Sequence, residues 1–223
     1  MAKQVRFDRV GGPEVLQIVE VDVPAPGPGE VRIAVKALGL NRAESLYRSG
    51  SYIIDPIFPA RLGSEAAGVI DAVGPDVAGL VPGDRVAVIP AFSYHDYGLY
   101  GDLVLAPVRA VAKLPEGLSW PDAAAVWMAY VTAWGALIDT ATLRAGETVL
   151  IPAAWSSVGL TAIQVANRIG AVPVALRRTA AKAIGHRLRG GEQLAAVGRI
   201  GTGGTDGALL DVPQRDPGAG LLH

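Results

Sequence analysis

Hydrophobic and polar positions alternate along much of the first half of the chain. Val31, Ile33 and Val35 alternate with more polar neighbours, and this period of two places one apolar row on one face of a strand. Further short strands are predicted at residues 4–7, 16–23, 68–73, 85–89 and 103–107. Pro and Gly separate them, as at residues 26–29 and 81–84. This pattern predicts a small antiparallel β-barrel.

The pattern changes at residue 119. Ser119 is followed three residues later by Asp122, with Pro121 between them, which is typical of a helix start. The apolar, Ala-rich run at residues 123–138 then predicts one helix, although its β-branched residues lower the helix propensity. The continuous apolar run at residues 148–151 predicts a parallel strand buried on both faces. A second domain is therefore expected to begin near residue 123.

A strand–helix–strand unit of about thirty residues, the length of a mononucleotide-binding half, is predicted from residue 148 to residue 176. Small residues in its loop would let the backbone approach a pyrophosphate at the helix N-terminus. Only Gly159 stands at a glycine position of the G-x-G-x-x-G pattern, so an ordinary tight turn remains an alternative. Trp155 must point away from the pyrophosphate or restrict its entry. The predicted cofactor-binding residues here are Ala154, Ser156, Ser157, Val158 and Gly159.

Cations follow the second strand of this unit. NAD sites place an acid there for the ribose 2′-hydroxyl, whereas NADP sites place cations there for the 2′-phosphate. Here the residues are Arg177, Arg178 and Lys182, and Arg offers a planar fork for phosphate oxygens. NADPH is the predicted cofactor, and a solvated basic turn is the alternative.

Composition narrows the possible chemistry. The chain has no Cys, which excludes disulfides and thiolate-ligated zinc, and its three His are too scattered to indicate a metal cluster. Half of the residues are apolar and the net charge is −1, as in a globular protein without a nucleic-acid partner. With no signal peptide and no apolar run of about 20 residues, we expect a cytoplasmic protein that does not enter membranes.

Two segments, residues 39–44 and 63–68, have the spacing of the zinc-ligand segments of an alcohol dehydrogenase. Asn41 stands where Cys is expected and Ser64 where His is expected. Amide and hydroxyl oxygens are poor zinc ligands, so we predict that no metal is bound. The chain resembles the zinc-less quinone oxidoreductase (zeta-crystallin-like) branch of the medium-chain dehydrogenase/reductases.

Further ordered matches, which extend the resemblance from residue 4 to residue 182, lie at residues 41–52, 73–74, 81–86 and 132–137. The resemblance implies a mixed β and α/β fold. A GroES-like antiparallel β-barrel catalytic domain at residues 1–122 would precede a partial Rossmann-type dinucleotide-binding domain at residues 123–182. Full-length members are expected to be dimers, and the oligomeric state of this chain is left open.

The resemblance implies NADPH-dependent hydride transfer to a quinone or an α,β-unsaturated carbonyl. It assigns catalytic roles to Asn41, Tyr52 and Ser64, and places Asn41 and Thr132 beside the nicotinamide. Each residue has a structural alternative: a turn for Asn41, packing for Tyr52, a helix-backbone bond for Thr132, and loop fixation for Ser64 with Glu65 paired to an Arg. An alcohol dehydrogenase-like oxidoreductase and an inactive remnant that acts only as a binding module are the alternative functions.

The resemblance ends after Lys182. Residues 183–223 are rich in Gly, Arg, Pro and Ala, and we expect no further Rossmann strand and no clear helix among them. This segment is predicted to be a divergent tail, either disordered or produced by a reading-frame change in a GC-rich coding sequence. Sequencing the source DNA tests that hypothesis.

Overall fold

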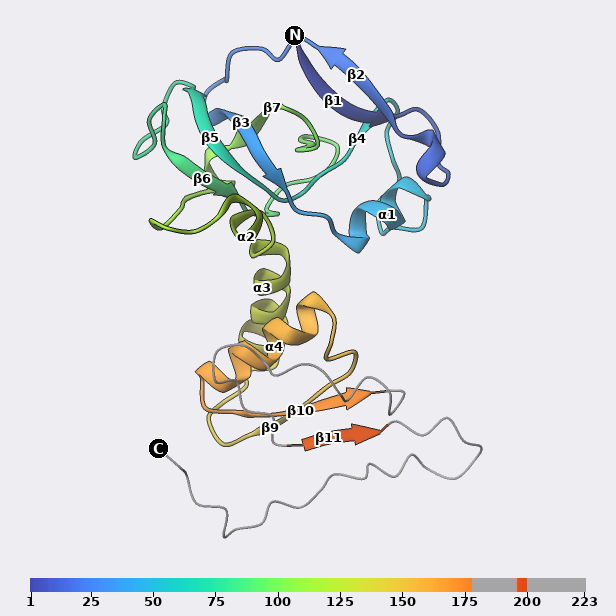
Figure 1. Ribbon diagram of the computed structural model, residues 1–223, viewed down its shortest axis with the longest axis vertical. Coiled ribbons are helices and arrows are strands. Elements are labelled where there is room, and N and C mark those ends of the chain that lie inside the picture. Colours follow the sequence, from blue (N-terminus) through green and yellow to red (C-terminus); the bar gives the residue numbers. More distant parts are fainter. Residues whose placement is uncertain (178–195, 200–223) are drawn as a thin grey trace. The chain divides into compact units, whose positions relative to one another are not determined.

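The computed structural model describes residues 1–177 and 196–199 (Figure 1). The chain divides into two compact units, Met1–Met128 and Ala129–His223. The domain boundaries expected from the sequence, one between residues 122 and 123 and one after residue 182, stay predictions. Arg178, Lys182 and most of the predicted tail lie outside the described residues.

The first unit contains two antiparallel sheets. The order of the five-stranded sheet is β7-β3-β5-β6-β8, with bounds β3 Glu30–Leu38, β5 Ala66–Val73, β6 Arg85–Val88, β7 Leu103–Pro107 and β8 Val111–Lys113. The order of the three-stranded sheet is β2-β1-β4, with bounds β1 Ala2–Phe7, β2 Gln17–Val21 and β4 Ala60–Arg61. Every strand expected from the sequence is present, and the antiparallel β architecture is as predicted.

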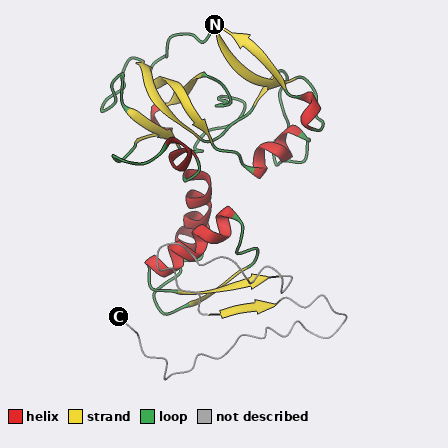
Figure 2. Ribbon diagram, in the orientation of Figure 1, coloured by secondary structure: helices red, strands yellow, loops and turns green. Residues whose placement is uncertain are grey.

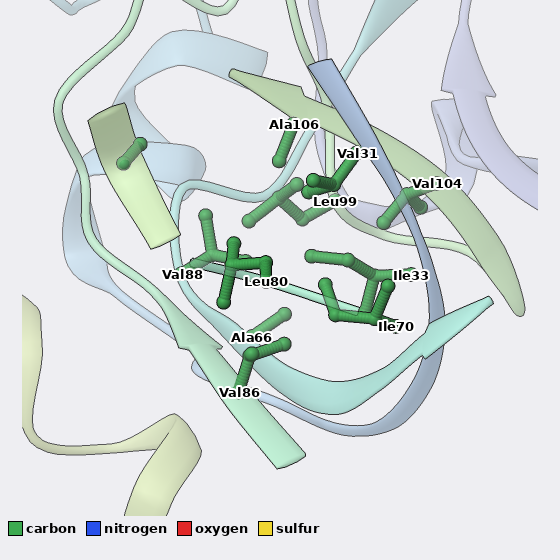
Figure 3. Packing of buried hydrophobic residues seen from close by; sticks show 11 residues of the cluster. Val31, Ile33, Ala66, Ile70, Leu80, Val86, Val88, Leu99, Val104 and Ala106 are labelled. Atoms are coloured by element: carbon green, nitrogen blue, oxygen red, sulfur yellow. The ribbon is translucent and has the colours of Figure 1, made fainter. Parts of the chain in front are cut away.

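The core of this unit follows from the alternation on β3. Val31 and Ile33 are fully buried, and Ile33 lies opposite Ile70 on β5 and Val104 on β7. Figure 3 shows these side chains converging between the strands. Because the apolar row of each strand faces the same interior, the period-two pattern fixes both the register and the core.

The helices of the first unit are short, and one prediction about them is wrong. The first unit contains two α-helices, α1 (Arg42–Arg48) and α2 (Trp120–Ala124), among its described residues. It also contains the 3₁₀ turns η1 (Pro13–Val15) and η2 (Val108–Ala110). The single helix expected at residues 123–138 is instead divided into α2, α3 (Trp127–Trp134) and the π-helix η3 (Gly135–Thr140) (Figure 2). The break has a tertiary cause: Glu65 Oε1 accepts from Met128 N at 3.1 Å, so a side chain supplies the acceptor in the first turn of α3.

The second unit contains a parallel sheet of order β11-β10-β9, formed by β9 (Thr148–Ile151), β10 (Val172–Arg177) and β11 (Ala196–Arg199). Helix α4 (Ser157–Arg168) connects β9 to β10, which confirms the predicted strand–helix–strand unit. The expectation that β9 is buried on both faces is wrong, because 43% of Leu150 is exposed. The expectation of no further strand after residue 183 is wrong, because β11 pairs in parallel with β10. Its four residues, Ala-Val-Gly-Arg, lack a continuous apolar run, so only pairing with β10 identifies them as a strand.

No helix in the described part of the chain is both long and apolar enough to cross a membrane.

Candidate functional site

Asn41 and Glu44 together begin helix α1. Asn41 is the N-cap residue in an extended conformation (φ −121°, ψ 151°), and its backbone N–H donates to Glu44 Oε2 at 2.8 Å. This is the reciprocal contact of a capping box, in which an acid three residues into the helix satisfies the N-cap amide. The structural alternative for Asn41, that it holds a turn, is therefore present. A functional role depends on its side chain.

Ser64 is bound to the same acid. Its hydroxyl donates to Glu44 Oε1 at 2.6 Å, and its backbone N–H lies 3.3 Å from that oxygen. Both residues are buried, with 5% of Ser64 and 4% of Glu44 exposed. Glu44 therefore joins the two segments that carry Asn41 and Ser64, and Ser64 serves here as a hydrogen-bond donor.

Glu65 makes the second connection and is almost completely buried, with 1% exposed. Its Oε2 accepts from Asn41 Nδ2 at 3.3 Å, while Oε1 accepts from Met128 N at 3.1 Å. The Arg partner that the structural alternative gave Glu65 is not found among the described residues, where amide donors contact both oxygens. Glu65 thus fixes the orientation of the Asn41 amide and ties it to the start of α3.

Burial raises the pKa of Glu65, and the charge of the nearby Glu44 acts in the same direction. Hydrogen bonds from Asn41 and from the backbone of Met128 and Trp127 act in the opposite direction. A buried carboxylate with hydrogen-bond donors on both oxygens keeps part of the stabilisation that water would give it. The polar cluster of Asn41, Glu44, Ser64 and Glu65 is therefore closely packed, and its hydrogen bonds depend on the protonation state of Glu65.

Replacing Glu65 with glutamine is expected to change the pH dependence of stability. Since the folded-state pKa of Glu65 lies above its usual 4.5, its contribution to the free energy of unfolding is present below pH 4.5 and is lost as pH rises through the folded-state value. Wild type should lose stability relative to Glu65→Gln over that range. Urea unfolding at several pH values measures the difference, with the exposed Glu20→Gln as control. Parallel wild-type and Glu65→Gln curves would contradict the assignment.

Tyr52 lies in an aromatic group beside this polar cluster. Its ring packs edge-on against Tyr47 (6.4 Å between centroids) and Tyr94 (6.0 Å), and Tyr47 stacks on Tyr94 at 4.7 Å. Burial raises the pKa of Tyr94, and the Glu44 carboxylate adds to the effect. Tyr94 therefore stays protonated as a donor over the neutral range. The packing alternative for Tyr52 is observed, and its catalytic role stays a prediction.

The donor chemistry of the cluster does not favour a metal. Within residues 1–177 and 196–199, no three or more His, Cys, Asp or Glu side chains are grouped so as to hold a metal ion. The cluster offers two carboxylates, and each already accepts hydrogen bonds from the protein. Zinc needs a near-tetrahedral set of strong ligands, which an amide and a hydroxyl do not complete.

The predicted phosphate loop ends in a capped helix. Ser156 is the N-cap of α4, and its hydroxyl accepts from Gly159 N at 3.0 Å. Ser156 and Ser157 are exposed, Val158 is half-buried and Ala154 is fully buried. Hydroxyls and the start of a twelve-residue helix are thus presented to solvent, an arrangement that suits an anion.

Gly159 allows the loop to lie directly on the helix. A Cβ at this position would lie 2.6 Å from Ala153 O and 2.7 Å from Ala154 Cα, both backbone atoms. Ala153 itself has φ of +52°, a left-handed conformation unusual for a residue with a side chain. The close approach requires glycine, which matches the role of the third glycine in dinucleotide-binding turns.

The other residues predicted to bind the cofactor are Thr132 and three cations at the end of the second strand, Arg177, Arg178 and Lys182. Thr132 is an exposed residue of α3 in the second unit. Arg177 is the last residue of β10, at the carboxyl end of a parallel strand. This end of a parallel sheet is where α/β folds bind nucleotides. Arg178 and Lys182 lie outside the described residues.

Comparisons with known proteins decide the family. A family model for the alcohol dehydrogenase GroES-like domain matches residues 27–116. The quinone oxidoreductases of Pseudomonas aeruginosa and Homo sapiens are each 41% identical to this chain, over 76% of its length and 51% of theirs. The chain belongs to the quinone oxidoreductase branch of the medium-chain dehydrogenase/reductases.

Solved structures of this branch share the fold. The Pseudomonas syringae pv. tomato quinone oxidoreductase superimposes with a TM-score of 0.73 at 38% identity, covering 82% of this chain and 55% of that one. The Escherichia coli quinone oxidoreductase, solved in complex with NADPH, gives 0.71 at 35% identity, with 81% and 54% covered. The chain therefore spans about half the length of the quinone oxidoreductases that it matches.

Three residues of the candidate site are not identified by the sequence analysis as site residues: Glu44, Glu65 and Tyr94. The spacing of Asn41 and Glu44 was a recognisable signal for the first, since an acid three residues after an N-cap forms a capping box. Glu65 directly follows Ser64, but its partners come from distant segments. No local signal identifies Tyr94.

Proposed function

We propose that this protein is an NADPH-dependent, zinc-independent oxidoreductase that reduces quinones or α,β-unsaturated carbonyls. The observation that carries the proposal is the polar cluster itself. Where a zinc enzyme of this superfamily has ligands, Asn41 and Ser64 are hydrogen-bonded to the buried acids Glu65 and Glu44. Both acids already accept hydrogen bonds from the protein. The cluster would therefore act on a substrate through the hydrogen-bond donors of its side chains.

Zinc independence is proposed from the hydrogen bonds that each side chain makes in the network. Freeing either acid to bind a metal would leave the Asn41 amide or the buried Ser64 hydroxyl without its acceptor. A buried polar group without a partner costs about 1–3 kcal/mol. The chain lacks Cys to offset that cost with a thiolate ligand.

The cofactor assignment rests on the loop and on charge. Bound NADPH would supply the hydride. Ser156, Ser157 and the first backbone amides of α4 would hold the pyrophosphate, and Arg177 with Arg178 and Lys182 would bind the 2′-phosphate. The NADPH complex of the related Escherichia coli enzyme supports this choice.

Asn41 is proposed to orient the acceptor. Reduction of a quinone or enone places negative charge on an oxygen, and a fixed amide N–H stabilises that charge. Because Glu65 holds one side of the amide, the group is oriented before the acceptor binds. Tyr52, half-buried beside the cluster, is proposed to cover the acceptor and donate the proton that the reduced oxygen needs.

Turnover with and without a chelator tests the function. NADPH consumption is followed with a quinone and with an enone, and NADPH formation is followed with a primary alcohol and NADP⁺, each before and after exhaustive chelation. The proposal expects oxidation of NADPH by a quinone or enone, unchanged by the chelator. Chelator-sensitive alcohol oxidation would instead identify an alcohol dehydrogenase-like enzyme. A folded chain inactive with every acceptor would support the inactive remnant.

Replacing Asn41 with serine is expected to lower kcat for the quinone by about 100-fold, the usual effect of removing one donor to a developing oxyanion. Serine keeps the N-cap of α1, so thermal stability should change little. Steady-state kinetics and a melting curve of the same sample separate the two effects. Unchanged kcat in a folded Asn41→Ser protein would assign Asn41 to the helix start alone.

A further inference from the structure

Two arginines lie directly opposite each other in the three-stranded sheet. The antiparallel register of β1 and β4 pairs Arg6 with Arg61. Like charges in directly opposed positions destabilise a sheet unless something compensates them. The pair therefore places two positive charges side by side, and a compensating group is expected near them.

Among the residues that the structure describes, no carboxylate forms an ion pair with either arginine. Arg6 Nε donates to Gln4 Oε1 at 3.0 Å, and Arg61 Nη2 donates to the backbone oxygens of His95 (3.1 Å) and Asp96 (2.6 Å). All of these acceptors are uncharged. In residues 1–177 and 196–199, neither arginine has a carboxylate oxygen within 4.0 Å. Burial lowers the pKa of Arg61 and the charge of Arg6 lowers it further, while the charge of Asp96 opposes them only in part.

Both arginines line one small cavity of about 100 Å³. Gln4, which is 8% exposed, and Gly98 also line it. A Cβ at residue 98 would lie 2.4 Å from Arg61 Cβ, so glycine leaves space beside the guanidinium stem. Asp22 is the one acidic residue in the lining, and it is exposed to solvent. Water occupies about 30 Å³ per molecule, so the cavity has room for a small oxyanion and none for a nucleotide.

We propose that the Arg6–Arg61 cavity binds a small tetrahedral oxyanion, sulfate or inorganic phosphate. A guanidinium presents N–H groups in a planar fork that matches two oxygens of such an anion. A bridging dianion would convert the repulsion between the two arginines into two charge-assisted contacts. The site is lined by residues of the three-stranded sheet, its loops and strand β7, and by none of the residues of the polar cluster or the phosphate loop, so it is independent of the reductase assignment.

Calorimetric titration of the full chain with sodium sulfate, in chloride buffer of constant ionic strength, tests the site. Wild type should bind one sulfate saturably. Arg6→Gln should weaken binding by about tenfold, as expected for loss of one charge-assisted contact. Arg109→Gln is the matched control, because it removes an exposed arginine on η2 that lies outside the cavity. Its affinity should equal that of wild type.

A melting experiment keeps the proposal falsifiable if a variant folds poorly. In low-salt chloride, Arg6→Gln should melt above wild type, since the repulsion is gone, and millimolar sulfate should raise the melting temperature of wild type but not of Arg6→Gln. Absence of saturable sulfate binding by wild type would overturn the proposal. So would equal affinities of Arg6→Gln and Arg109→Gln, or acetate binding as tightly as sulfate.

Discussion

Replacing Ile33 with alanine is expected to lower the free energy of unfolding of the first unit by about 2–5 kcal/mol. Ile33 is fully buried on β3, opposite Ile70 and Val104. In Figure 3 its side chain lies beside those of Ile70 and Val104, so neighbouring strands on both sides lose contacts. The backbone of paired strands cannot close the resulting cavity without shifting register, which limits relaxation.

Ile18→Ala is the matched control for Ile33→Ala. Ile18 is also an isoleucine on a strand of the first unit, but 73% of it is exposed, so its replacement should change stability by less than about 0.5 kcal/mol. Urea unfolding followed by circular dichroism measures both variants. Equal effects of the two substitutions would show that the first unit is not stabilised by the core described above.

Replacing Gly159 with alanine is expected to disrupt the phosphate loop. The new methyl group would lie less than 3 Å from three backbone atoms of Ala153 and Ala154, and backbone cannot move aside as a flexible side chain can. Overpacking of this kind costs about 1–3 kcal/mol. Because the loop would move away from α4, we expect NADPH affinity to fall by at least about tenfold.

Gly135→Ala is the control for this substitution. Gly135 lies at the start of the π-helix η3, and a Cβ there would meet nothing within 4 Å. Alanine should therefore leave NADPH affinity unchanged and, by restricting the unfolded chain, stabilise by up to about 1 kcal/mol. Wild-type NADPH affinity in Gly159→Ala would contradict the placement of the cofactor at this loop.

Much of the fold could be predicted because its causes are local. The alternation at Val31, Ile33 and Val35 specified a strand and its buried face. Ser119 and Asp122 identified the start of α2, and the apolar run at residues 148–151 identified β9. In each case neighbouring residues alone determine the element.

The errors arose where distant residues decide the outcome. The division between α2 and α3 depends on Glu65, which lies 63 residues before the Met128 amide that it accepts. Strand β11 has no strong pattern of its own and is defined by pairing with β10. Similarly, spacing identified Asn41 and Ser64 as site residues, but only the folded chain shows that Glu65 and Glu44 are their partners.

Titration of the purified chain with NADPH and NADH at low salt tests the central claim most directly. Trp155 lies in the phosphate loop, so its fluorescence should report binding. We expect saturable binding that is tighter for NADPH than for NADH, with the preference weakening as salt screens the arginines. A folded chain that binds neither nucleotide, or that prefers NADH, would contradict it.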